Sequence, residues 1–175
     1  MSRFFMTFFF FLLFVSVTAC SASSNRHPSD FSLTFDWNTG SLPPQYHYSY
    51  TITIQPDGKG SLDYQPGYEP DETTRWQTEF SLTGKQMDAL YDYLIENDLL
   101  RATWNLGEPS LGGSGSSLVV TADGKEYAVP SISELQPEDR RRMEATIDTI
   151  KNLLPQNIWD ELDARQQAYE SGFEE

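Results

Sequence analysis

Strict alternation of apolar and polar side chains is the feature of this sequence that most constrains its fold. Residues 31–37 place an apolar side chain at every second position and polar side chains between them. The same alternation recurs over residues 46–55, 60–64 and 74–82. A period of two residues is typical of a strand with one buried face. The sequence therefore predicts an antiparallel sheet that buries one of its faces.

Two turns of sequence Asp-Gly-Lys join expected strands. The first, at residues 57–59, follows a proline, and the second, at residues 123–125, separates expected strands over 116–122 and 125–129. Asp-Gly tolerates the positive φ of a tight hairpin, and proline presets φ at its own position. The segments around the two turns are similar. Either a duplicated hairpin–helix unit or chance would explain this similarity.

Three segments have the spacing of amphipathic helices. Thr83 and Gln86 fit a capping box, and apolar side chains then recur three and four residues apart. A second helix is expected to begin near residue 133 or 137, and a third to cover residues 156–169. These elements predict a single α+β domain over residues 31–170. It has an antiparallel sheet of about six strands, with roughly two or three helices packed on one face.

The chain begins with the three parts of an export signal. Arg3 supplies a positive charge, residues 4–17 are almost wholly apolar, and small residues follow as far as Ala19. The apolar run is shorter than the roughly 20 residues that span a bilayer as a helix. We therefore expect residues 1–19 to be a removed signal. The small polar residues 20–30 are expected to form a lipidated N-terminus and flexible tether.

The segment Val17-Thr18-Ala19-Cys20 resembles the lipobox of bacterial lipoproteins, in which small residues precede a cysteine. The resemblance covers the signal alone, and Val17 stands where the commonest form has Leu. It implies that Cys20 becomes the mature N-terminus and carries a diacylglycerol, often with a third acyl chain such as palmitate, that inserts into a bilayer. Cys20 is the single cysteine of the chain, so it cannot form an internal disulfide. An ordinary signal peptide with an unrelated cysteine is the alternative.

The resemblance implies a location at the bacterial cell envelope. Ser21 follows the cysteine, and in enteric bacteria an Asp there favours the inner membrane. By this resemblance Ser21 favours the outer membrane, facing the periplasm, if the source is Gram-negative. The net charge of −14 argues against nucleic-acid partners and against direct contact with anionic headgroups. The lipid on Cys20 is therefore expected to hold the protein at the membrane.

Residues that commonly carry catalysis or bind metals form no recognisable constellation in this sequence. Nucleophilic catalysis needs a nucleophile, a base and an orienting group, but Cys20 is expected to be lipidated and His47 to be exposed on a polar strand face. The glycine-rich residues 111–117 lack the lysine of a phosphate loop. The stretch 36–40 begins like a calcium loop but does not complete it, and the carboxylates of residues 63–72 are expected to form a solvated acidic loop, with structural calcium as the alternative. Neither a cofactor nor a metal site is predicted.

Arg140, Arg141 and Arg142 form the one basic cluster. Glu138 lies four residues before Arg142, and Glu144 lies four residues after Arg140, as in ordinary ion pairs on a helix surface. A docking patch for an acidic partner is the alternative.

Two aromatic residues lie in segments with neither strand nor helix periodicity. Tyr68 and Trp104 are therefore the candidate interaction surface. The sequence favours a non-catalytic binding module with an envelope protein as partner, because it combines a tether and a compact domain with no recognisable group of catalytic residues. This architecture is similar to that of bacterial lipoproteins whose mature part is a domain of unknown function. The alternatives are a carboxylate-dependent hydrolase and an inhibitor of a secreted enzyme. The last residues, 171–175, are expected to fray.

Overall fold

The computed structural model describes residues 26–69, 72–108 and 112–173. The predicted signal, the lipidation residue Cys20 and the first part of the predicted tether lie outside these residues, as do residues 174–175 of the predicted tail. The described chain forms a six-stranded antiparallel sheet and three helices, which confirms the predicted α+β class.

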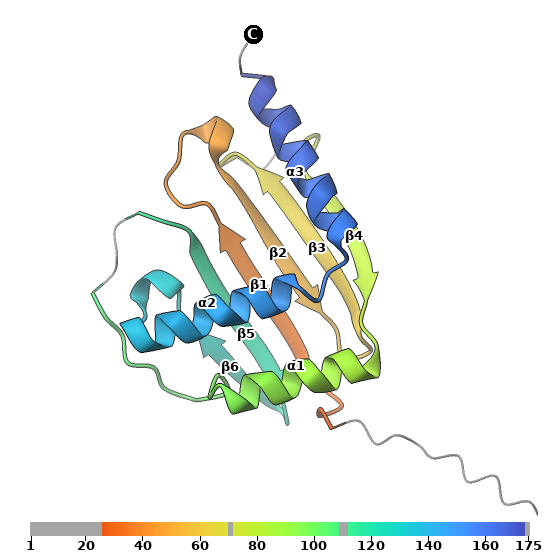
Figure 1. Cartoon of the computed structure of the whole chain (residues 1–175), viewed down its shortest axis with the longest axis vertical. Coiled ribbons are helices and arrows are strands. Elements are labelled where there is room, and N and C mark those ends of the chain that lie inside the picture. Colours follow the sequence, from red (N-terminus) through yellow and green to blue (C-terminus); the bar gives the residue numbers. More distant parts are fainter. Residues whose placement is uncertain (1–25, 70–71, 109–111, 174–175) are drawn as a thin grey trace, which may run out of the picture.

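The sheet has the strand order β4-β3-β2-β1-β5-β6, and every neighbouring pair is antiparallel (Figure 1). The two predicted hairpins, β2–β3 and β5–β6, lie on either side of β1. The strands are β1 (Ser32–Asn38), β2 (Tyr48–Ile54), β3 (Lys59–Pro66), β4 (Trp76–Ser81), β5 (Gly115–Ala122) and β6 (Lys125–Val129).

A row of aromatic side chains crosses the inner face of the sheet. Trp76 on β4 lies opposite Tyr64 on β3, and Tyr64 lies opposite Tyr50 on β2. Tyr50 in turn lies opposite Trp37 on β1. The adjacent row, nearer the start of β1, is mostly aliphatic and forms the centre of the core. Its members are Thr78, Leu62, Ile52, Phe35 and Leu118.

Three helices cover this inner face: α1 (Gly84–Glu96), α2 (Pro137–Lys151) and α3 (Gln156–Ser171) (Figure 1). This confirms the predicted packing of helices on one face. The predicted capping box begins α1, where Gln86 N donates to Thr83 Oγ1 (3.3 Å) and Thr83 N donates to Gln86 Oε1 (3.0 Å). Such reciprocal bonds satisfy two backbone donors that a helix start leaves unpaired.

The opposite face of the sheet is polar, and no helix of the described segments covers it (Figure 1). Thr51 Oγ1 donates to Asp36 Oδ1 at 2.7 Å, and Arg75 forms an ion pair with Asp63. A sheet with one solvated face requires the apolar–polar alternation from which the strands were predicted.

Arg26 and His27, in the last part of the predicted tether, lie against α1. His27 is 7% exposed, and its Nδ1 lies 2.7 Å from Asp88 Oδ1. The same oxygen accepts hydrogen bonds from the backbone N–H groups of Arg26 (2.7 Å) and His27 (3.1 Å). Arg26 also forms an ion pair with Asp92 at 2.7 Å. The chain is therefore fixed to the domain before β1 begins.

The prediction for His47 was wrong. The alternation over residues 46–55 placed it on an exposed strand face, but a short 3-10 helix occupies Pro44–Tyr46 and β2 begins at Tyr48. His47 is 9% exposed, and the ring of Tyr68 stacks on it with centroids 3.8 Å apart. Proline fixes φ at a value suited to the first turn of a helix, so the strand starts later than the alternation indicates.

Candidate ligand-binding site

A pocket of about 410 Å³ lies between the aromatic row of the sheet and the junction of α2 with α3. Four aromatic side chains line it: Trp37, Tyr48, Tyr50 and Trp159. Pockets that bind small molecules are commonly lined by aromatic side chains with a few polar groups among them. This pocket therefore has the composition of a binding site.

Strand register brings three of these rings together. Trp37 and Tyr50 are cross-strand partners, and their rings stack with centroids 5.1 Å apart and planes 18° apart. Tyr48 lies two residues before Tyr50 on the same strand face, and its ring centroid is 5.2 Å from that of Trp37. Aromatic contacts of this kind stabilise a sheet beyond the area that they bury.

The fourth ring comes from α3, which begins directly after Pro155. Trp159 meets Tyr50 edge-on, with centroids 5.4 Å apart. Its Nε1 donates to the carbonyl oxygen of Lys151 at 3.1 Å, which ties the indole to the last turn of α2. The Lys151 ammonium lies 5.2 Å from the centre of the same ring, within cation–π range. The α2–α3 turn thus fixes one wall of the pocket.

The Tyr50 hydroxyl is the unusual atom of this pocket. Tyr50 is 3% exposed, and its oxygen has no hydrogen-bond partner among the described residues. Burial raises the pKa of this phenol, so the group is a neutral donor and acceptor at physiological pH. A buried hydroxyl without a partner costs about 1–3 kcal/mol, so Tyr50 holds its place in the pocket wall at a cost to the stability of the domain.

Charged and neutral polar side chains complete the lining of the pocket. Lys151, Asn152, Gln156 and Asp163 line the pocket, together with the apolar Leu154 and Leu162. Burial and the nearby carboxylates of Asp163 and Glu170 raise the pKa of Tyr48. The pocket therefore combines aromatic surface with one ammonium, one carboxylate and two amides.

A second pocket, of about 490 Å³, lies at the β3–β4 side of the sheet. Its one ring is that of Phe80, which lies over Gly60, its cross-strand partner. A Cβ on Gly60 would meet this ring at 2.3 Å, so the ring fills the space that a side chain at Gly60 would occupy. Because Phe80 already packs on the sheet, this pocket offers a ligand less aromatic surface than the first.

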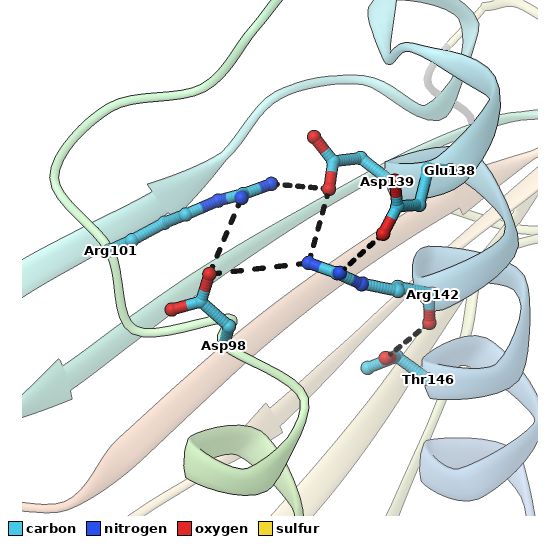
Figure 2. A network of polar contacts seen from close by, with 6 residues as sticks. All are labelled: Asp98, Arg101, Glu138, Asp139, Arg142 and Thr146. Carbon is cyan, nitrogen blue, oxygen red and sulfur yellow. Dashed lines mark hydrogen bonds and ion pairs between the residues drawn. The ribbon is translucent and has the colours of Figure 1, made fainter.

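Trp104, a predicted interaction residue, lies against Arg101, which belongs to the charged network drawn in Figure 2. The Arg101 guanidinium lies 3.7 Å from the centre of the Trp104 ring, and the indole is half-buried. Arg101 also forms ion pairs with Asp139 (2.5 Å) and Asp98 (3.5 Å). One face of Trp104 is thus covered by a side chain of the same domain.

One residue of the predicted basic cluster, Arg142, belongs to the same network. Arg142 forms the expected ion pair with Glu138 at 2.7 Å and also lies 3.5 Å from Asp139 (Figure 2). Arg140 donates from Nη2 to the carbonyl oxygen of Leu135 at 3.2 Å. Arg142 therefore pairs with carboxylates of its own helix, as predicted for the pair with Glu138.

Tyr68, the other predicted interaction residue, is 51% exposed. Its hydroxyl donates to the carbonyl oxygen of Leu42 at 2.7 Å, and its ring covers His47. Within the described residues its contacts are with the segment before β2, whereas Trp104 contacts Arg101 in the segment that follows α1. Cys20, the predicted lipidation residue, lies outside the described chain.

Other findings bear on the class of protein. Within residues 26–69, 72–108 and 112–173, no three His, Cys, Asp or Glu side chains are grouped so as to hold a metal ion. No helix in this part of the chain is both long and apolar enough to cross a membrane. Neither a protein-family model nor a curated protein sequence matches the chain. Functional inference therefore starts from the fold and the pocket.

Sequence reasoning assigned the pocket residues to ordinary core packing. The alternation did place Trp37, Tyr48 and Tyr50 on buried strand faces, and an excess of aromatic residues at neighbouring positions was visible. What the sequence lacked was the register that sets Trp37 beside Tyr50 and the turn that brings Trp159 against Tyr50.

Proposed function

We propose that this protein is a lipid-anchored protein of the bacterial envelope whose domain binds a small ligand in the aromatic pocket and catalyses no reaction. The observation that carries the binding function is the pocket of about 410 Å³, whose lining combines four aromatic rings with an ammonium, a carboxylate and two amides. The lipobox-like segment ending at Cys20 carries the anchoring function.

The geometry of the chain suits a membrane-anchored binding domain. About six residues separate Cys20 from Arg26, so the chain between them reaches at most roughly 20 Å. Arg26 and His27 are fixed to α1, next to the start of β1. Trp37 lies about six residues further along the extended chain, roughly 20 Å from Phe31. The pocket is therefore at the end of β1 remote from the anchor, where a bilayer does not obstruct it.

Binding is favoured over hydrolysis by the charges in the pocket. Glycoside hydrolysis by carboxylates needs two acidic side chains on either side of the bond. The described lining of the pocket contains one, Asp163. This favours a module that holds a ligand over an enzyme that cleaves it.

The binding function is tested by native mass spectrometry of the full chain extracted from bacterial membranes. We expect a bound small molecule on the wild type, which is lost in Trp37→Ala and retained in Trp76→Ala. Trp76 is a matched control because it lies in the same aromatic row but is not among the residues that line the pocket. A wild type without a bound molecule, or equal loss in both variants, would contradict the proposal.

The anchor is tested separately by fractionation of cells that express the wild type or Cys20→Ala. We expect the wild type to sediment with membranes and to incorporate labelled palmitate. Cys20→Ala is expected to incorporate none and to leave the membrane fraction. Retention of Cys20→Ala in membranes to the same extent as the wild type would contradict lipid anchoring at Cys20.

A further inference from the structure

We infer that the aromatic pocket is a carbohydrate site that takes a neutral saccharide of about one or two pyranose rings. The inference rests on the proposed binding function and names the class of ligand. It follows from the rings, the polar groups, the charge balance and the size of the pocket.

The aromatic rings match the faces of a sugar. A pyranose ring has faces of C–H bonds and an edge of hydroxyl groups. The faces of Trp and Tyr carry negative charge density, which attracts the slightly positive hydrogens of C–H groups. Trp37, Tyr48 and Trp159 are each half-buried, so part of each side chain remains accessible to a ligand.

The polar groups match the edge of a sugar. Hydroxyl groups both donate and accept, and the pocket offers partners for both roles. The Lys151 ammonium donates, the Asp163 carboxylate accepts, and the amides of Asn152 and Gln156 do both. A wholly apolar ligand would displace water from these groups without pairing them, which is unfavourable. The ligand therefore carries several hydroxyl or amide groups.

The balance of charge favours a neutral ligand. A cation would be repelled by the Lys151 ammonium, which already lies 5.2 Å from the centre of the Trp159 ring. An anion would be repelled by the Asp163 carboxylate, which lines the pocket. A neutral polyhydroxylated molecule avoids both repulsions and bonds to both charged groups.

The volume sets the number of sugar rings. Pockets for small molecules run from about 300 to 1,000 Å³, and this one, at about 410 Å³, is near the lower limit. It is therefore suited to one or two rings, such as the end of a glycan or a short unit within one.

The test is isothermal titration calorimetry on the full chain, in a detergent whose headgroup carries no sugar. The probes are cellobiose, maltose and N,N′-diacetylchitobiose, with choline as a cationic probe. We expect saturable binding of at least one disaccharide. Its affinity should change less than about twofold between low and high salt, because screening acts on charged ligands.

Two variants connect binding to the pocket. Trp37→Ala should weaken saccharide binding about tenfold or more, as loss of a central aromatic contact does. Asp163→Asn keeps the shape of an exposed lining side chain but removes the carboxylate that accepts hydrogen bonds from sugar hydroxyls, and should weaken binding about three- to tenfold. Trp76→Ala, the control outside the pocket, should bind as the wild type does.

The outcomes separate the saccharide from the wider proposal. Binding of choline but of no saccharide, weakened by Trp37→Ala, overturns the carbohydrate assignment and leaves a binding pocket. Saccharide binding that is equal in the wild type, Trp37→Ala and Asp163→Asn overturns the assignment to this pocket. Suppose that no probe binds, but that the protein from membranes carries a ligand which Trp37→Ala loses. The carbohydrate assignment is then overturned, and the proposed binding function stands. If that protein carries no ligand either, both proposals fail.

Discussion

The hydroxyl of Tyr64 donates a hydrogen bond of 2.7 Å to Oε1 of Gln166, and this contact joins α3 to the aromatic row of the sheet. The amide nitrogen of Gln166 donates to the carbonyl oxygen of Gln45 (3.0 Å) and to Glu170 (2.9 Å). Gln166 is 6% exposed. A buried amide whose donors and acceptor are all paired holds the position of α3, and so of Trp159 in the pocket wall.

Replacement of Gln166 by Ala should therefore destabilise the domain. It leaves the Tyr64 hydroxyl and the Gln45 carbonyl without their partner, and we expect a loss of about 2 kcal/mol in the free energy of unfolding. Urea denaturation of the full chain measures this. Gln167→Ala, an exposed neighbour on the same helix, should change stability by less than about 0.5 kcal/mol. Equal effects of the two changes would contradict the role of Gln166.

Replacing Tyr50 or Tyr64 by Phe should change the free energy of unfolding in opposite directions. The two side chains are cross-strand partners and are 3% and 0% exposed, but only the Tyr64 hydroxyl has a partner in the described residues. Tyr50→Phe should raise the free energy of unfolding by about 1 kcal/mol, because it removes a buried group without a partner. Tyr64→Phe should lower it by about 1 kcal/mol. Thermal unfolding of both variants tests this prediction. A Tyr50→Phe variant that is less stable than the wild type would show that the Tyr50 hydroxyl is paired.

The contact of His27 with Asp88 predicts a dependence of stability on pH. The His27 side chain, aided by the backbone N–H groups of His27 and Arg26, holds the pKa of the Asp88 carboxyl below its usual value, against the opposing effect of desolvation. A carboxylate with a lowered pKa stabilises the folded state above the pKa of the unfolded chain, about 3.9 for Asp. This stabilisation is lost as the pH falls through the folded pKa.

The measurement compares the wild type with Asp88→Asn by urea denaturation between pH 6 and about pH 3. We expect the wild type to be the more stable at pH 6 and its advantage to shrink below about pH 4. Asp92→Asn, on the same helix but paired with the exposed Arg26, should cost less than about 1 kcal/mol at pH 6. An advantage over Asp88→Asn that stays constant across this range would contradict the prediction.

Much of the fold was predictable because local patterns determine it. Alternation defined the strands, since each has one buried and one solvated face. The capping box at Thr83 marked the start of α1 because it satisfies backbone donors locally. Such signals need no knowledge of distant residues.

The binding site was not predictable because it depends on contacts between distant residues. Trp37 and Tyr50 meet through strand register, and Trp159 joins them from α3, more than a hundred residues further along the chain. Trp104 lies in a segment without periodicity, which indicated exposure, yet Arg101 covers one of its faces. Pairing of this kind follows from the tertiary structure and leaves no periodic signal in the sequence.

The network of Arg101 and Asp139 should stabilise the segment that follows α1 (Figure 2). The Asp139 side chain is 9% exposed and lies 2.5 Å from Arg101 Nη2 and 3.5 Å from Arg142 Nη1. Arg101→Met keeps much of the aliphatic stem but removes the charge. It leaves a buried carboxylate with one remaining cation, so we expect a loss of about 2–3 kcal/mol.

A double-mutant cycle tests this role of Arg101. Because Asp139→Asn removes the buried charge, Arg101→Met should cost less in that background, with a coupling of about 1–2 kcal/mol. Trp104 provides a second readout: its fluorescence should change in Arg101→Met, since the guanidinium lies 3.7 Å from its ring. Arg141→Met is the control, because Arg141 is exposed on the same helix as Asp139. Additive effects of the two changes, with unaltered Trp104 emission, would mean that the ion pair does not hold this segment in place.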